Sequence, residues 1–92
     1  MQKATPADEQ TAEKMLESII HMMVDKPEEV RIDHHMGGVT ATFEIYAHDS
    51  DVGKILGKKG IHAKALRTLF TAIYGKLGKR LHLTVIDPRN RR

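Results

Sequence analysis

The amino-acid sequence predicts a small α+β domain in which three helices cover one face of a three-stranded sheet, in the order α-β-β-α-α-β. Apolar residues recur with a helical period before residue 27 and on both sides of residues 57–60. They alternate with polar residues over 30–47 and 81–85, as in half-buried strands. The 92 residues, 40% of them hydrophobic, suffice for one core and not for two.

The first helix is expected to begin at Thr5-Pro6, because a threonine side chain caps a helix and proline suits its first position. It is expected to end at Lys26-Pro27, since the residue before a proline avoids the helical conformation. Core filling is the favoured role of its methionines, and a subunit contact is the alternative. Its apolar stripe comprises Ala12, Met15, Leu16, Ile19, Ile20, Met22, Met23 and Val24.

Three strands are expected, over residues 30–35, 39–47 and 80–85. The first two are joined where the chain reverses at Gly37-Gly38. The second strand presents every other residue, from Val39 onwards, to the buried face of the sheet. One face of the sheet is therefore expected to be apolar and the other wet.

The two later helices have recognisable end signals. The short one ends at Leu56, and either Asp49 or Ser50 is expected to cap its start. The long one is followed by Gly78, the expected residue just beyond a helix C-terminus. Gly75 is the alternative end, one turn earlier.

The loop Gly57-Lys58-Lys59-Gly60 between these helices is built to hold an anion. Gly57 tolerates the positive φ expected at the end of the short helix, and Gly60 lets the chain reverse into the next one. The first N–H groups of that helix lack intrahelical acceptors and carry partial positive charge. We therefore expect the two lysines and the amides near Gly60 and Ile61 to bind a phosphate.

Two nucleotide-binding motifs do not fit this loop. A P-loop needs G-x-x-x-x-G-K-[ST] after a strand, whereas the residues before Gly57 are predicted to be helical and Ile61 follows the second glycine. A dinucleotide-binding motif needs a third glycine and a later acidic residue, and neither is in place. The GXXG loop of a KH domain does fit, and it holds the backbone of about four nucleotides of single-stranded nucleic acid.

The net charge of +3 hides a strong asymmetry along the chain. Residues 1–51 contain four Lys/Arg and eleven Asp/Glu, a charge of −7, whereas residues 52–92 contain eleven Lys/Arg and one Asp, a charge of +10. The half with the glycine loop therefore has the charge expected of a polyanion binder. The alternative is a solvated surface in which the two halves attract one another.

Four segments carry a resemblance to a known family: VDKPEEVR (24–31), DVGKILGKKG (51–60), AKALRT (63–68) and GKR (78–80). With the order α-β-β-α-α-β, they make the chain resemble a type II KH domain. More narrowly, it resembles the small, single-domain bacterial KH proteins of the KhpA type. The resemblance places a KH domain at residues 15–87. An N-terminal extension, 1–14, contains the start of the first helix, and 88–92 form a basic tail expected to be disordered.

The resemblance implies an RNA-binding protein that acts in post-transcriptional regulation or as an RNA chaperone, without a cofactor. It leaves room for pairing with itself or with a second KH-containing protein. The extension and the tail exceed the minimal domain of the family, so the resemblance assigns them no role.

Lys58 and Lys59, with Gly57, Gly60 and Ile61, are the expected phosphate clamp. Lys54, Lys64 and Arg67 are expected to extend the phosphate track, with solvated helix faces as the alternative. Core packing is the favoured role for Ile55, Leu56 and Leu66. The base groove beside the clamp is expected to be lined by Val52, Ile55 and Leu56 of the short helix, by Ala63 and Leu66 of the long helix, and by an edge of the second strand at Ile45.

An enzyme is the less favoured class. The chain has no cysteine, its six histidines show no metal-ligand spacing, and its two serines lie in a helix and in a predicted cap. A protein-interaction module on a KH scaffold is the main alternative, in which Lys58 and Lys59 would be dispensable. Without an apolar run of about 20 residues or a signal peptide, the chain is expected in the cytoplasm, with no membrane partner.

Overall fold

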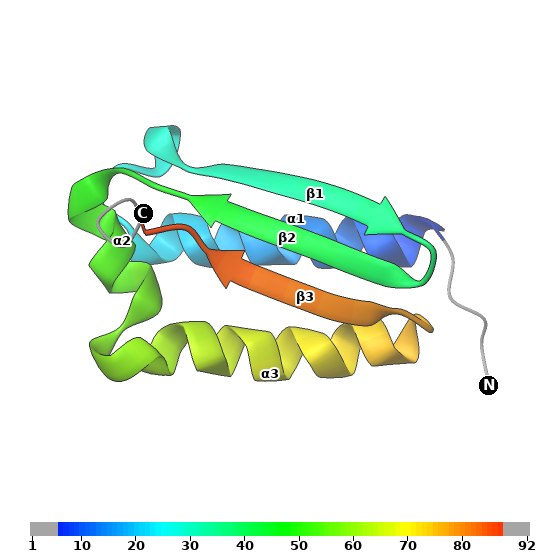
Figure 1. The fold of residues 1–92 in the computed structure, drawn as a ribbon. Helices are drawn as coiled ribbons and strands as arrows, with labels where there is room; N and C mark the ends of the chain where they lie inside the picture. Colours follow the sequence, from blue (N-terminus) through cyan, green and yellow to red (C-terminus); the bar gives the residue numbers. More distant parts are fainter. Residues whose placement is uncertain (1–5, 88–92) are drawn as a thin grey trace.

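A computed structural model describes residues 6–87 and confirms the predicted α+β fold (Figure 1). The cap expected at Thr5 and the tail expected at 88–92 lie outside the described residues. In chain order the elements are α1 (Pro6–Met23), the short 3₁₀ helix η1 (Pro27–Glu29), β1 (Arg31–Gly37), β2 (Thr40–Tyr46), α2 (Asp49–Leu56), the 3₁₀ turn η2 (Lys58–Gly60), α3 (Ile61–Lys76) and β3 (Arg80–Val85).

The sheet has the order β1-β2-β3, so β2 is its central strand. β1 and β2 are antiparallel, as a short turn allows, whereas β2 and β3 are parallel. A parallel pair needs a crossover, and here α2, the glycine loop and α3 form it (Figure 1). In the order β1-β2-β3, β3 is the edge strand that lies nearest α3 (Figure 1). The strand edge predicted at Ile45 is wrong, because Ile45 belongs to the central strand.

The hairpin turn differs by one residue from the prediction. β1 continues through Gly37, which pairs with Thr40, so Gly38 and Val39 form the turn. Gly38 has a φ of +58°, a conformation that suits glycine in a tight hairpin. Val39 is 62% exposed in this turn, so the prediction that it starts the buried face of β2 is wrong.

The helix ends confirm the predicted end of α2 at Leu56 and Gly78 just beyond α3, and they correct two other predictions. Gly78 has a φ of +79°, and the next N–H, that of Lys79, donates to the Tyr74 carbonyl at 2.8 Å, as expected just beyond α3. α1 ends at Met23, ahead of the expected Lys26-Pro27. α2 is capped by His48, whose Nδ1 accepts the Ser50 N–H at 3.1 Å. Asp49 and Ser50 are therefore inside the helix rather than caps.

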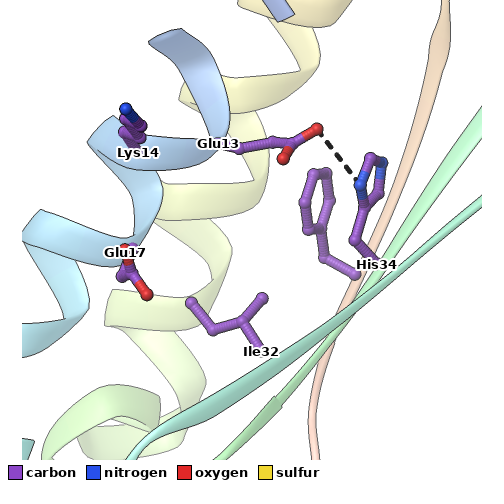
Figure 2. Close-up of a pocket in the computed structure, with 6 residues that line it drawn as sticks. Glu13, Lys14, Glu17, Ile32 and His34 are labelled. Carbon is purple, nitrogen blue, oxygen red and sulfur yellow. Dashed lines mark ion pairs between the residues drawn. The ribbon is translucent and has the colours of Figure 1, made fainter. Parts of the chain in front are cut away.

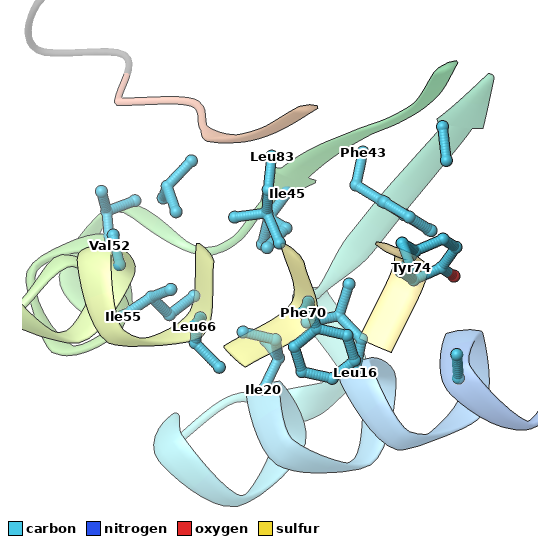
Figure 3. Packing of buried hydrophobic residues seen from close by; sticks show 14 residues of the cluster. Leu16, Ile20, Phe43, Ile45, Val52, Ile55, Leu66, Phe70, Tyr74 and Leu83 are labelled. Atoms are coloured by element: carbon cyan, nitrogen blue, oxygen red, sulfur yellow. The ribbon is translucent and has the colours of Figure 1, made fainter. Parts of the chain in front are cut away.

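One hydrophobic core holds the helices against the sheet (Figure 3). Within it, Phe43 is stacked on His34 with ring centroids 4.5 Å apart and lies edge-on to Tyr74 at 5.6 Å. The largest fully buried apolar side chains come from all three helices and from β2 and β3; they are Leu16, Ile20, Phe43, Ile45, Val52, Ile55, Phe70, Tyr74 and Leu83.

The methionines of α1 do not all fill this core. Met23 packs partly against it, but Met15 is 46% and Met22 is 87% exposed. Core filling is therefore the wrong role for Met15 and Met22. They are apolar side chains left at the surface.

Candidate nucleic-acid interface

The glycine loop reverses the chain through three residues with left-handed backbone conformations. Gly57 and Gly60 have φ values of +75° and +77°, as predicted, and Lys59 between them has a φ of +57°. The Lys58 and Lys59 side chains are both exposed. No ion pair within residues 6–87 holds either of them. Two ammonium groups are therefore presented to solvent at the junction of α2 and α3.

The loop uses two of its own amides. The Gly60 N–H donates to the Gly57 carbonyl at 2.9 Å, and the Ile61 N–H donates to the Lys58 carbonyl. The expectation that these two amides are free for a phosphate is wrong, because the 3₁₀ turn pairs each with the carbonyl three residues earlier. Gly60 is the N-cap of α3, and among residues 6–87 no side chain makes a capping hydrogen bond there.

Gly57 is required for space as well as for conformation. A Cβ atom there would lie 2.5 Å from the ring Cγ of His62 and 2.8 Å from its backbone nitrogen. The His62 ring also bonds the carbonyl of Lys54 through Nδ1, at 2.9 Å. His62 therefore joins α3 to α2 directly behind the loop. This contact was not predicted, because its only signal in the sequence is a histidine two residues after the second glycine.

Most of the expected groove residues belong to the core. Ile45, Val52 and Ile55 have no exposed surface, and Ala63 is 3% exposed. Their side chains therefore offer nothing to a base, because all four are packed in the hydrophobic core. Leu66, at 8% exposure, also packs in the core.

The accessible apolar surface at the loop comes from two other residues. Leu56 is half-buried and packs against the core only in part. Ile61 is 61% exposed.

The three cations expected to extend the phosphate track differ in whether other groups of the protein engage them. Lys54 Nζ lies 3.4 Å from Asp51 and 3.5 Å from Asp25, so internal carboxylates already engage it. Arg67 donates from Nε to the Leu83 carbonyl at 3.1 Å, which ties α3 to the free edge of β3. Lys64 is exposed, and no ion pair within residues 6–87 holds it.

Asp51 is a buried carboxylate whose role was not predicted from the sequence. Its side chain is fully buried and accepts the backbone N–H groups of Asp25 at 3.2 Å and Lys26 at 2.9 Å. Burial acts to raise its pKa, but these N–H groups and the Lys54 ammonium together outweigh burial and hold the pKa below its usual 3.8. Asp51 therefore fastens α2, which carries the loop, to the linker after α1.

A separate pocket of about 140 Å³ lies between α1 and the sheet, on elements that do not carry the loop (Figure 2). Its main polar contact is an ion pair of 3.1 Å between Glu13 and Nδ1 of His34. Within residues 6–87, no three histidine or acidic side chains are grouped as a metal site. None of the helices there is long and apolar enough to cross a membrane. The pocket is lined by Glu13, Lys14, Glu17, Ile32, His34 and Phe43.

The fold and the loop together define the class of this protein. Three helices and a three-stranded sheet follow one another as α-β-β-α-α-β, and a GXXG loop with two exposed lysines joins the second and third helices. This is the architecture of a KH domain.

Comparison with known proteins gives the family. Residues 13–85 match the model of the KhpA/KhpB KH domain, and the chain belongs to this family. It is 38% identical over 73 residues to RNA-binding protein KhpA of Halalkalibacterium halodurans, covering 79% of this chain and 96% of the relative. It is 36% identical over 74 residues to RNA-binding protein KhpA of Borreliella burgdorferi, covering 80% and 90%. The protein of the same name from Aquifex aeolicus is 38% identical over 65 residues, covering 71% and 82%.

Proposed function

We propose that this chain is a cytoplasmic, non-enzymatic RNA-binding protein that holds single-stranded RNA at its GXXG loop. The observation that carries the proposal is the pair of exposed lysines, without ion pairs among residues 6–87, on a loop that turns directly into an uncapped helix. The names of the relatives agree with it, since they are RNA-binding proteins. Post-transcriptional regulation or RNA chaperoning is the role that we propose for it.

In this proposal, Lys58 and Lys59 neutralise phosphates, while Leu56 and Ile61 contact bases or sugars. Aromatic stacking contributes little, because Phe43, Phe70 and Tyr74 are buried. Tyr46 is covered by Arg31, whose guanidinium carbon lies 4.1 Å from the ring centroid. Binding to one site should therefore depend strongly on phosphate contacts, and log K should fall by about 0.7 per decade of salt for each phosphate neutralised.

The test is a double variant, Lys58→Asp with Lys59→Asp, measured for binding to a fluorescein-labelled oligouridine at two salt concentrations. We expect affinity to fall by at least about tenfold and the salt slope to flatten, since both phosphate contacts are lost. Circular dichroism checks that the fold is intact.

The matched control is Lys14→Asp with Lys76→Asp, which changes the net charge equally. Both of these lysines are exposed, and neither lies in the loop. Equal losses in the two double variants would refute the clamp and leave only general charge attraction. If the parent chain binds no RNA, the alternative of a protein-interaction module is favoured.

We also propose that the chain pairs with a second copy or with another KH-containing protein. The support is apolar surface without a partner in residues 6–87, above all Met22 at the end of α1. Pairing would place two loops on one RNA and raise its affinity by avidity.

A further inference from the structure

His62 is the second residue of α3, yet its side chain forms a hydrogen bond with α2. The last carbonyl groups of a helix have no intrahelical donors, and α2 ends at Leu56. His62 Nδ1 supplies a donor to one of them, the carbonyl of Lys54, at 2.9 Å. The same ring occupies the space beside Gly57, where a Cβ would come within 2.5 Å of it. The imidazole thus links the start of α3 to the end of α2 beside the loop.

This hydrogen bond decides which nitrogen carries the proton. A carbonyl oxygen only accepts, so Nδ1 must be the donor and Nδ1–H is the neutral tautomer. Nε2 has no hydrogen-bond partner within residues 6–87, and the residue is exposed. When Nε2 is protonated, the ring keeps its bond to Lys54 and gains a second donor and a positive charge next to the loop.

The charges around His62 are mostly positive. They are Lys54 on α2, Lys58 and Lys59 in the loop, and Lys64 on α3. On α2, Asp51 is buried and already engaged, and Asp49 lies at the opposite end of the helix. A bound phosphate would offset these lysines and so favour the protonated ring.

We propose that His62 is a third member of the phosphate clamp, which positions the loop through Nδ1 and, once protonated, contacts the RNA backbone through Nε2. This inference rests on the proposed RNA-binding function. Because binding then takes up a proton, the affinity for RNA rises as the pH falls from about 8 to about 6, the range in which histidines change charge.

Two substitutions separate the two roles. His62→Asn keeps a donor close to the position of Nδ1 but cannot become charged. We expect it to keep the melting temperature of the parent chain and to lose most of the gain in affinity for labelled oligouridine between about pH 8 and about pH 6. His62→Ala removes the donor too, so we expect a lower melting temperature and several-fold weaker binding at both pH values.

The matched control is His35→Asn, which removes an exposed histidine from the sheet. It should keep the pH dependence of the parent chain. A His62→Asn variant with the full pH dependence would refute the charged contact. A His62→Ala variant with parental melting temperature and affinity near pH 8 would refute the positioning role.

A nitrogen-15 NMR spectrum of the histidine rings tests the tautomer without RNA. A neutral His62 that carries its proton on Nε2 would overturn the inference even if RNA binds as proposed. Conversely, if RNA binding does not depend on Lys58 and Lys59, the proposed function fails while the Nδ1–H tautomer is still observed. The two failures are therefore distinguishable.

Discussion

The Tyr74 hydroxyl is a polar group buried in an apolar core. The residue is 1% exposed, and its hydroxyl has no hydrogen-bond partner within residues 6–87. Burial raises the pKa of Tyr74 to about 12, and the carboxylates of Glu13 and Glu9 add to the rise. The ring is needed to fill the core, whereas the hydroxyl gives up hydration without a compensating bond.

We expect Tyr74→Phe to leave stability unchanged or to raise it by up to about 1 kcal/mol near pH 7, because it removes a buried, unpaired hydroxyl. The unfolded tyrosine ionises near pH 10, and the folded one only near 12. The parent chain should therefore lose stability as the pH rises from about 10 to 12, and the variant should lose less. Urea unfolding across this range checks both points. A variant destabilised by about 2 kcal/mol would show that the hydroxyl has a partner.

Among the elements, α2 is the helix whose position sets the orientation of the glycine loop. It has eight residues, too few for a helix that is stable by itself. Its position comes from Val52 and Ile55 in the core, from the His62 bond at its end, and from Asp51 on the linker after α1. Two of these attachments are polar. The orientation of the loop should therefore be sensitive to polar substitutions that leave the core intact.

Asp51→Asn tests the attachment between α2 and the linker. We expect the melting temperature near pH 7 to fall by several degrees, because an amide is a weaker acceptor for two backbone N–H groups and loses the attraction to Lys54. The pKa of Asp51 is lowered by folding, so its contribution is present above about pH 4 and is lost as the pH falls below it. The variant should therefore show a shallower loss of stability in acid.

Asp49→Asn is the control for this substitution, since Asp49 is an exposed carboxylate in the first turn of the same helix. Thermal melts followed by circular dichroism at several pH values make the comparison. Equal behaviour of the two variants would mean that Asp51 acts only through the charge of the helix N-terminus.

Across the whole molecule, ion pairs between the acidic and basic halves engage only some of the basic residues. Lys79 pairs with Glu9 at 3.5 Å, and Lys54 pairs with Asp25 at 3.5 Å, so the basic and acidic halves do attract one another. Lys58 and Lys59 take no part in such pairs within residues 6–87. Attraction between the halves therefore explains some of the basic residues but not those of the loop.

The proposed pairing is also a property of the whole molecule. We expect light scattering to give a mass above the 10.4 kDa of one chain at high concentration, falling towards it on dilution. Met22→Glu should shift the mass towards the monomer, because a charge at an apolar contact is costly. Val39→Glu, at an exposed apolar residue of the hairpin turn, should not. A mass equal to one chain at every concentration would contradict pairing with a second copy.

Local patterns were good guides wherever a residue acts on its own backbone neighbours. The element order, Gly78 beyond α3 and the positive φ of Gly57 and Gly60 were all predicted from periodicity and from glycine. Predictions failed where the same local pattern fits two different structures. A histidine caps α2 although Asp49 and Ser50 are both good caps, and Val39 alternates correctly with its neighbours but lies in a turn.

The sequence by itself determined the fold class, the family and the lysine-bearing loop, because periodicity, glycine positions and charge are local properties of the chain. Only the tertiary structure decided which groups are free to act. Ile45 is buried in the central strand, Lys54 is engaged by Asp25 from the linker after α1, and His62 bonds α2 across the glycine loop. Each of these depends on how different elements pack against one another, and no local pattern encodes that packing.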